Sequence, residues 1–267
     1  MPFIDGDGNL LRTVELGQVP IMAPTFQLRK RIGYYAPRPG PVPPEAEITW
    51  APAHVPSDHP DSTDRTDLAS VPAIFWSLIA SYGRQTAPAV IHDSECARVQ
   101  ASQRTGEYTA AQALEERARI DRAFRLGLRE LGVAPFRAWV MWTFVSFERY
   151  AKHSVVKLVG LVLLAALGLA LVAGAPVALG LGAPWWAVLL MLVAPLGTSA
   201  IAGSRWQLLV WASYAGALLL PVAVLQVAAY LPYAAIENVV WFLVDWLPHR
   251  KGSPVVGPVD VKNIRRT

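Results

Sequence analysis

The pattern of apolar positions divides the chain into two differently built halves. Residues 158 to 204 contain no Asp, Glu, Lys or Arg, and Leu, Ala, Val and Gly dominate this run. A helix needs about 20 apolar residues to cross roughly 30 Å of hydrocarbon. Segments near 157 to 175, 185 to 203 and 208 to 230 meet that requirement. The sequence therefore predicts a membrane region and excludes a wholly soluble protein.

The segment from Leu231 to Pro248 allows two interpretations. Glu237, Trp241 and Asp245 fall on one polar stripe at helical spacing. Such a stripe suits an interfacial helix, or a fourth span with the stripe turned inward. The basic C-terminal tail, residues 249 to 267, favours a cytoplasmic end, and an N-terminus on the same side then requires an even number of spans. We expect three or four membrane helices and prefer four.

The first half of the chain predicts strands followed by helices. Residues 25 to 35 form the best early strand candidate. Residues 36 to 60 hold eight prolines, a density that neither a helix nor a central strand tolerates. We therefore expect a loop there, with residues 48 to 50 as a short edge strand. From Ser70 the pattern becomes helical, and the first helix ends near Gly83.

Three further helices complete this half. One runs from Thr86 to about Gln103. The next spans 110 to 131, because residues 109–112 (TAAQ) have the form of a capping box. Pro135 begins the last, which carries aromatic residues toward the membrane. The patterns together predict an α+β fold, in which a small strand-then-helix domain precedes an all-α transmembrane region.

Composition and charge set the boundaries and the orientation. We expect a soluble domain over residues 1 to 150, a membrane region over 151 to 248 and the basic tail after it. Eight of the ten tryptophans lie at or after position 139, as is typical of a membrane interface. Basic residues precede the first span, whereas the connection from 174 to 184 carries none. The positive-inside rule therefore places the N-terminal domain in the cytoplasm.

These properties predict an integral protein of the cytoplasmic membrane, with the lipid bilayer as its partner. The N-terminal residues 1 to 9 are acidic and lack a basic n-region, so we expect no signal peptide. Lys and Arg exceed Asp and Glu by 24 to 20, a net charge of +4. This excess is too small to predict a nucleic-acid partner.

Two titratable residues fall on apolar stripes of the predicted helices. Steps of three and four from Ala89 reach His92 and then Cys96, so His92 is expected to point inward. Asp121 occupies a core-facing position of the helix over 110 to 131. Because a buried carboxylate requires a partner, spacing alone predicts an inward pair of His92 and Asp121.

Two more carboxylates extend this candidate site. Asp67 precedes the helix start at Ser70, and Asp93 follows His92 directly. Imidazole nitrogen and carboxylate oxygen are the ligands of hydrolytic zinc, manganese and iron sites. We therefore take Asp67, His92, Asp93 and Asp121 as candidate catalytic residues, the last three as ligands of one divalent ion.

Structural interpretations of the same residues stay open. His92 and Asp121 also fit a hydrogen-bonded buried pair without chemistry. Asp67 also fits a turn or capping residue, and Cys96 a small buried hydrophobe. His54, in the proline-rich loop, is expected to be solvated. The sequence contains neither a Gly-rich phosphate loop nor a His-Glu-x-x-His motif.

Three motifs in order carry a resemblance to a known family. Residues 66–72 (TDLASVP), 89–93 (AVIHD) and 119–124 (RIDRAF) resemble the family catalogued as domain of unknown function 1353, common in tailed phages, prophages and bacterial genomes. The resemblance covers roughly residues 20 to 150. It implies a small mixed domain with strands first and helices after. Its recurring polar residues fall on Asp67, Ser70, His92, Asp93 and Asp121.

The chain departs from that family pattern in two places, and the family brings no established activity. Residues 94–96 (SEC) replace the usual aromatic after the His-Asp doublet, and residues 61–65 (DSTDR) replace a glycine-containing approach to the first motif. Either departure from the family pattern is consistent with a lost activity.

Two functional hypotheses follow, and the sequence leaves open whether the protein is an enzyme. The first is a membrane-anchored protein of phage or mobile-element type that acts as a metal-dependent hydrolase. Its ion would activate water, and a carboxylate would serve as general base. The alternative is a non-enzymatic membrane-tethered module with a structural or protein-docking role.

Overall fold

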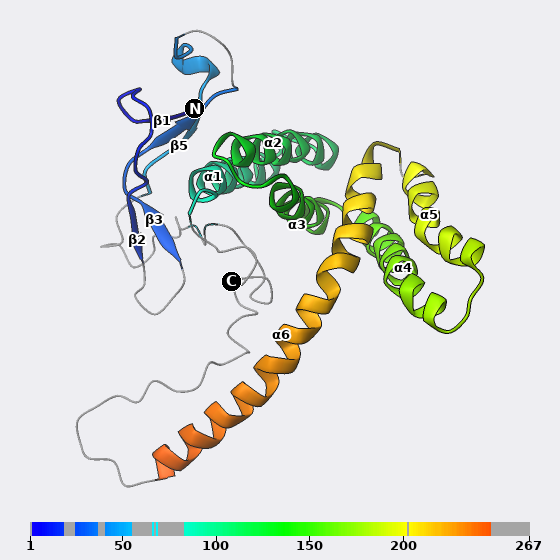
Figure 1. The fold of residues 1–267 in the computed structure, drawn as a ribbon. Coiled ribbons are helices and arrows are strands. Elements are labelled where there is room, and N and C mark those ends of the chain that lie inside the picture. The colour runs from blue at the N-terminus through cyan, green and yellow to red at the C-terminus, as the bar shows by residue number, and fades with distance from the viewer. Residues whose placement is uncertain are drawn as a thin grey trace. The chain divides into compact units, whose positions relative to one another are not determined.

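The computed structural model describes residues 2–18, 25–36, 41–54, 66, 68, 83–201 and 203–246 of the 267-residue chain. Short strands come first and helices follow, which is the expected α+β order (Figure 1). The described residues up to Ala217 form one compact unit, and those from Leu218 onward form a second. The predicted helix from Ser70 to Gly83 lies outside the described residues, apart from its end.

The strands form two small antiparallel sheets. The larger has the order β1-β4-β5, built from β1 (Phe3–Asp5), β4 (Ile32–Tyr34) and β5 (Thr49–Ala51). The smaller pairs β2 (Leu16–Gln18) with β3 (Phe26–Leu28). A 3-10 turn, η1 (Glu45–Glu47), precedes β5. The short edge strand predicted inside the proline-rich loop is confirmed as β5.

The single strand predicted over residues 25 to 35 is two strands, β3 and β4, in different sheets. Three consecutive basic residues separate them. Lys30 forms an ion pair with Glu15 at 2.6 Å, and Arg31 forms one with Glu45 at 3.2 Å. Because these cations are solvated on the surface, the chain turns there instead of continuing through a sheet.

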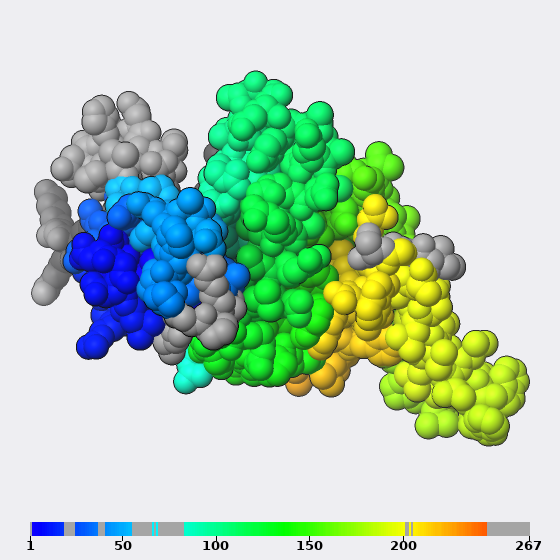
Figure 2. Space-filling model, turned by 90° about the horizontal axis from the view of Figure 1, so that it is seen from above, coloured from blue at the N-terminus to red at the C-terminus, as the bar shows by residue number. Residues whose placement is uncertain are grey.

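Helix α1 (Thr86–Arg104) covers the larger sheet with its N-terminal half. Residues 86 to 92 are all buried. Val90 and Ile91 share one apolar core with Phe3, Ile32 and other strand residues. In Figure 2 the strands, in blue, lie against the helical layer, in green. The sheet therefore fixes the end of α1 that carries His92.

Helices α2 (Ala110–Glu130) and α3 (Pro135–His153) form an antiparallel hairpin beside α1 (Figure 1). The predicted capping box is confirmed: the Gln112 N–H donates to Thr109 Oγ1, and the Thr109 N–H donates to Gln112 Oε1 at 2.9 Å. Gly132, at φ +75°, ends the hairpin's first arm as expected. Pro135 stands in the first turn of α3.

The second half contains three apolar helices: α4 (Val155–Gly180), α5 (Trp185–Ile201) and α6 (Trp206–Trp246). A 3-10 turn, η3 (Gly203–Arg205), precedes α6. Helices α4 and α6 are long and apolar enough to cross a membrane, and α5 is shorter, with 17 residues. Two helices of this kind support membrane association by their length and composition.

The separate helix expected to begin at Leu231 is wrong, because α6 is continuous over 41 residues. Pro221 and Pro232 lie inside it, and the helix continues although each proline removes one N–H donor and crowds the carbonyl four residues before it. No cluster of turn-forming residues separates the two predicted segments. At 1.5 Å per residue α6 is about 60 Å long, twice the thickness of a bilayer's hydrocarbon layer.

The helices before and after Ser154 share one core within the first unit. Tyr150 of α3, Leu161 of α4 and Leu208 and Leu209 of α6 are buried together. Trp211 of α6 stacks on Trp139 of α3 with ring centroids 5.1 Å apart. Helices α2 and α3 are thus packed directly against the start of the apolar region.

Close packing of α4 on α6 depends on a glycine. A Cβ atom added to Gly168 would meet the Ser213 side chain, with Ser213 Cβ only 2.9 Å away. Small residues allow backbones to approach in this way and favour helix association in lipid. At Gly160, on the same helix, an added Cβ would meet no atom within 4 Å.

We therefore expect Gly168→Val to destabilise the protein by about 1 to 3 kcal/mol, the usual cost of overpacking. The measurement is thermal unfolding of the full chain in detergent, followed by tryptophan fluorescence. Gly160→Val is the matched control and should unfold at the temperature of the parent. Equal melting of both variants would show that α4 and α6 do not pack at Gly168.

Candidate functional site

A buried ion triad joins the three helices of the N-terminal half. His92 of α1 places Nε2 2.9 Å from Asp121 Oδ1 of α2. Arg149 of α3 donates from Nη1 to Asp121 Oδ2, also at 2.9 Å. The exposed fractions are 5% for His92, 0% for Asp121 and 6% for Arg149. The predicted inward pair of His92 and Asp121 is therefore present, with a third member.

The triad favours a charged imidazole. Burial by itself lowers the pKa of His92, but hydrogen bonds with Asp121, Asp93 and Cys96 outweigh it and raise that pKa well above 6.5. A shift in this direction favours the imidazolium form of His92. Two cations thus face the two oxygens of one carboxylate, which leaves Asp121 with both oxygens engaged.

Asp93 lies beside the triad and is held by Thr66. The Thr66 hydroxyl donates to Asp93 Oδ2, while Thr66 exchanges backbone hydrogen bonds with Phe26 of β3. Asp93 Oδ1 is 3.7 Å from His92 Nδ1, and the side chain is 31% exposed. The first family motif thus positions the doublet carboxylate through Thr66. Asp67, the fourth candidate residue, lies outside the described residues, as does Ser70.

Cys96 contacts the imidazole one helical turn below. Its Sγ is 3.6 Å from both ring nitrogens of His92. Burial raises the pKa of the thiol, although the neighbouring His92 and Arg117 lower it in part. Since the thiolate is the reactive form, Cys96 acts here as a packing residue, next to Val99 and Ala113.

The geometry limits how a metal ion would be held. Asp121 already pairs with two cations, so it would orient His92 instead of binding the ion. The remaining donors beside the imidazole are His92 Nδ1 and the Asp93 carboxylate. Within the described part of the chain, no group of three or more His, Cys, Asp or Glu side chains is placed to hold a metal.

A small cavity of about 50 Å³ lies between the sheet and helices α1 and α2. Its polar lining includes His92, Glu95 and Arg119 from the helices and Thr49 from the sheet. Phe3, Ile91 and Phe124 contribute apolar surface. The volume suits a few water molecules, and so the imidazole has room for water beside it but not for a large substrate.

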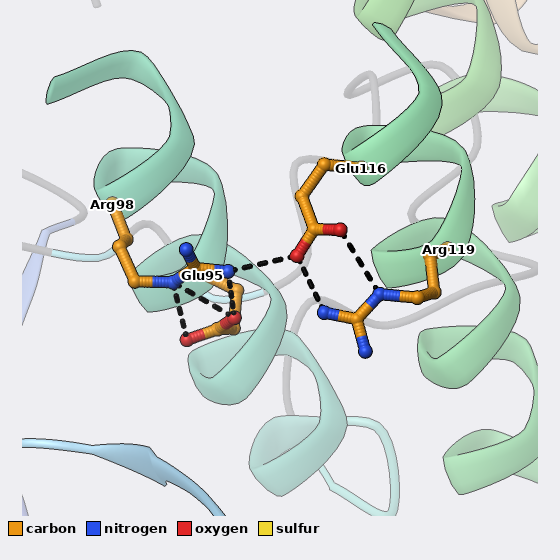
Figure 3. Close-up of polar contacts among 4 residues, drawn as sticks. All are labelled: Glu95, Arg98, Glu116 and Arg119. Atoms are coloured by element: carbon orange, nitrogen blue, oxygen red, sulfur yellow. Dashed lines mark hydrogen bonds and ion pairs between the residues drawn. The ribbon is translucent and has the colours of Figure 1, made fainter. Parts of the chain in front are cut away.

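An ion-pair network of four exposed or half-buried side chains bridges α1 and α2 (Figure 3). Arg98 pairs with Glu95 at 2.8 Å within α1 and with Glu116 of α2 at 3.0 Å. Arg119 also pairs with Glu116, donating from Nε at 3.0 Å. The hydrogen bond from Arg119 is the main reason that the pKa of Glu116 is lowered, with Arg98 adding to it. The four side chains hold one another in place.

Several polar residues that matter were not predicted as such. Arg149 and Arg117 were not among the candidate site residues, yet both are buried. Steps of three and four from Ala113 reach Arg117 and Asp121, and the same steps from Ala138 reach Arg149. This helical spacing from buried alanines is the sequence feature that indicates inward-pointing arginines. His54 was expected to be solvated, but its Nδ1 accepts the Leu28 N–H at 3.1 Å because the loop returns to β3.

Comparison with known families places these residues in context. Residues 61–145 match the model of the family described as protein of unknown function (DUF1353). The predicted family resemblance is confirmed for this segment. The DUF1353 segment contains His92, Asp93 and Asp121 but ends before Arg149, and it leaves out strands β1 to β5. No curated protein and no solved structure matches the chain.

We expect Asp121→Asn to destabilise the protein by about 3 to 5 kcal/mol, because the change leaves His92 and Arg149 buried without their counter-charge. Thermal or denaturant unfolding of the full chain measures this loss. Glu115→Gln, an exposed carboxylate change on the same helix, should alter stability by less than about 0.5 kcal/mol. A loss that small for Asp121→Asn as well would contradict a structural role for the triad.

Proposed function

We propose that this chain is a membrane-anchored structural and protein-docking module. The observation that carries the proposal is the double engagement of Asp121 by His92 and Arg149. A carboxylate with both oxygens in buried ion pairs is poorly disposed to bind a metal. The same arrangement is well suited to hold α1, α2 and α3 in one register.

Attachment to the membrane is supported by α4 and α6, which within the described part of the chain are the helices long and apolar enough to span. The shared core around Tyr150 and Leu209 packs the DUF1353 helices onto the first turns of this region. Such a core suits a module that presents its surface at a fixed position. The cytoplasmic orientation and the phage or mobile-element origin stay predictions from the sequence.

The surface that we propose for docking is the outer face of α1 and α2. The Glu95–Arg98–Glu116–Arg119 network lies there (Figure 3). An open hollow of about 460 Å³ adjoins it, with Tyr108, Gln112 and Arg122 on its walls. Side chains already ordered by ion pairs lose little entropy on binding. We propose a partner protein that presents charges of both signs.

The docking face can be tested by photocrosslinking in intact cells. A photoreactive amino acid at position 122 should give one discrete adduct with a partner protein. The Arg119→Glu change should abolish this adduct, because it turns an attraction for Glu116 into repulsion and breaks the network. Arg137→Glu, an exposed change on α3, is the control and should leave the adduct intact. An adduct insensitive to Arg119→Glu would contradict docking at this face.

A second candidate function is the metal-dependent hydrolase. It is favoured by one observation: His92 Nδ1 and Asp93 Oδ1 lie 3.7 Å apart, with Asp121 behind the imidazole. A carboxylate–histidine–metal arrangement has this order of groups. A single zinc, manganese or iron ion would bind His92 and Asp93 and supply an activated water. His92 would first have to lose its proton.

Elemental analysis of the full chain, purified without chelator, separates the two functions. The structural proposal expects no bound zinc, manganese or iron, and expects His92→Gln to lower stability by about 1 to 3 kcal/mol through the broken buried hydrogen bond. About one equivalent of metal in the parent and little in His92→Gln would instead establish the metal site. Cys96→Ala is the control for a change at the imidazole's other neighbour and should leave the metal content unaltered.

A further inference from the structure

One buried cation in the helical layer has no counter-charge of its own among the residues that the structure describes. Arg117 of α2 is only 3% exposed. Within the described part of the chain, its Nε and Nη2 atoms have no hydrogen-bond partner. An unpaired guanidinium is among the most costly groups to bury. A feature of this kind in a folded protein indicates a partner, such as an ion or water, that completes it.

The neighbouring helix adds more unsatisfied atoms at the same level. The Asp121–Arg149 bond sets the register of the antiparallel pair α2 and α3. Arg117 lies one turn from Asp121, and His153 lies one turn from Arg149 in the matching direction. Among the described residues, Arg149 Nε, His153 Nε2 and Ser146 Oγ are also buried without partners. Gln103 Oε1 of α1 lies 2.7 Å from His153 Nδ1, so α1 also contributes a side chain to this layer.

The charges in this layer do not balance. Asp121 supplies one negative charge, whereas Arg117 and Arg149 supply two positive charges. His92 is balanced by its other neighbour Asp93, whose Oδ1 lies 3.7 Å from Nδ1, so among the described residues one cation is in excess. The deficit is therefore one anion, and the unsatisfied guanidinium N–H groups would donate to it. Arginine guanidinium matches the geometry of phosphate and carboxylate oxygens better than any other side chain.

We propose that Arg117, Arg149 and His153 form a binding site for a phosphate oxyanion, supplied by a lipid headgroup. The site lies at the C-terminal end of α3, and Ser154 alone separates α3 from the apolar helix α4. Lys152 and Lys157 are exposed on either side of this joint. Cations at such a position attract the anionic surface of a bilayer. Free phosphate has the same chemistry and is the other source.

The test measures whether anions stabilise the protein through Arg117. The full chain is purified in detergent, stripped of lipid, and its melting temperature is followed by tryptophan fluorescence. Phosphatidylglycerol, phosphatidylcholine and inorganic phosphate are titrated separately, against sodium chloride at equal ionic strength. We expect phosphatidylglycerol to raise the melting temperature by about 5 °C or more at saturation, since ligand binding stabilises the folded state.

Arg117→Met should lose this response, with at least a tenfold weaker apparent affinity. Methionine keeps the length of the side chain and removes an unpaired charge, so the unliganded variant should melt no lower than the parent. Arg122→Met, an exposed change on the same helix, should respond as the parent does. Arg117→Lys keeps the charge but not the planar fork and should retain part of the response.

The outcomes also separate the two sources of phosphate. Stabilisation by phosphatidylglycerol well beyond that by inorganic phosphate supports the headgroup. An equal response to inorganic phosphate, lost in Arg117→Met, supports the oxyanion site but overturns the lipid source. A parent that responds to neither anion, or an Arg117→Met variant that responds like the parent, overturns the site altogether and leaves Arg117 to solvent.

Discussion

The packing of the N-terminal half depends on the carboxylate of Asp121. It is fully buried and receives His92 from α1 and Arg149 from α3, so three helices meet at one negative charge. Apolar contacts alone allow helices to slide by a turn at modest cost. A charge that must find two specific partners does not, because any other register leaves buried ions unpaired. The triad therefore specifies the arrangement more than it adds to the total stability.

Periodicity predicted most of the helical part. The capping box at Thr109, the proline at 135 and the inward stripe through His92 and Asp121 each reflect local rules, and the structure agrees with them. Long-range effects produced the failures. The division of residues 25 to 35 into two strands follows from pairing with different partners, β3 with β2 and β4 with β1 and β5, which lie elsewhere in the sequence. The continuity of α6 through Pro232 was obscured by a polar stripe that resembled a separate helix.

The site was predicted only in part for a similar reason. His92 and Asp121 were predicted from their spacing, because each lies on the apolar stripe of a helix. Arg117 and Arg149 lie on the same kind of stripe but were not taken as site residues, because arginine is seldom buried. The difference is decisive for the chemistry. With His92 and Asp121 alone the pair resembles a metal site, whereas with Arg149 added the carboxylate is saturated. Asp67 lies outside the described residues and stays a prediction.

The joint at Ser154 has a mechanical consequence. Its N–H donates to the Tyr150 carbonyl and its own carbonyl accepts from the Leu158 N–H, so both helix ends are hydrogen-bonded at a residue whose backbone (φ −164°, ψ 82°) is not helical. A joint of one residue, clamped by the core around Leu161, leaves little torsional freedom. In a bilayer the charged face of α1 and α2 would keep a constant distance from the membrane and a constant orientation about the membrane normal. The rate of encounter with a partner would then depend on lateral diffusion in the membrane, and not on rotation of a flexibly linked N-terminal domain.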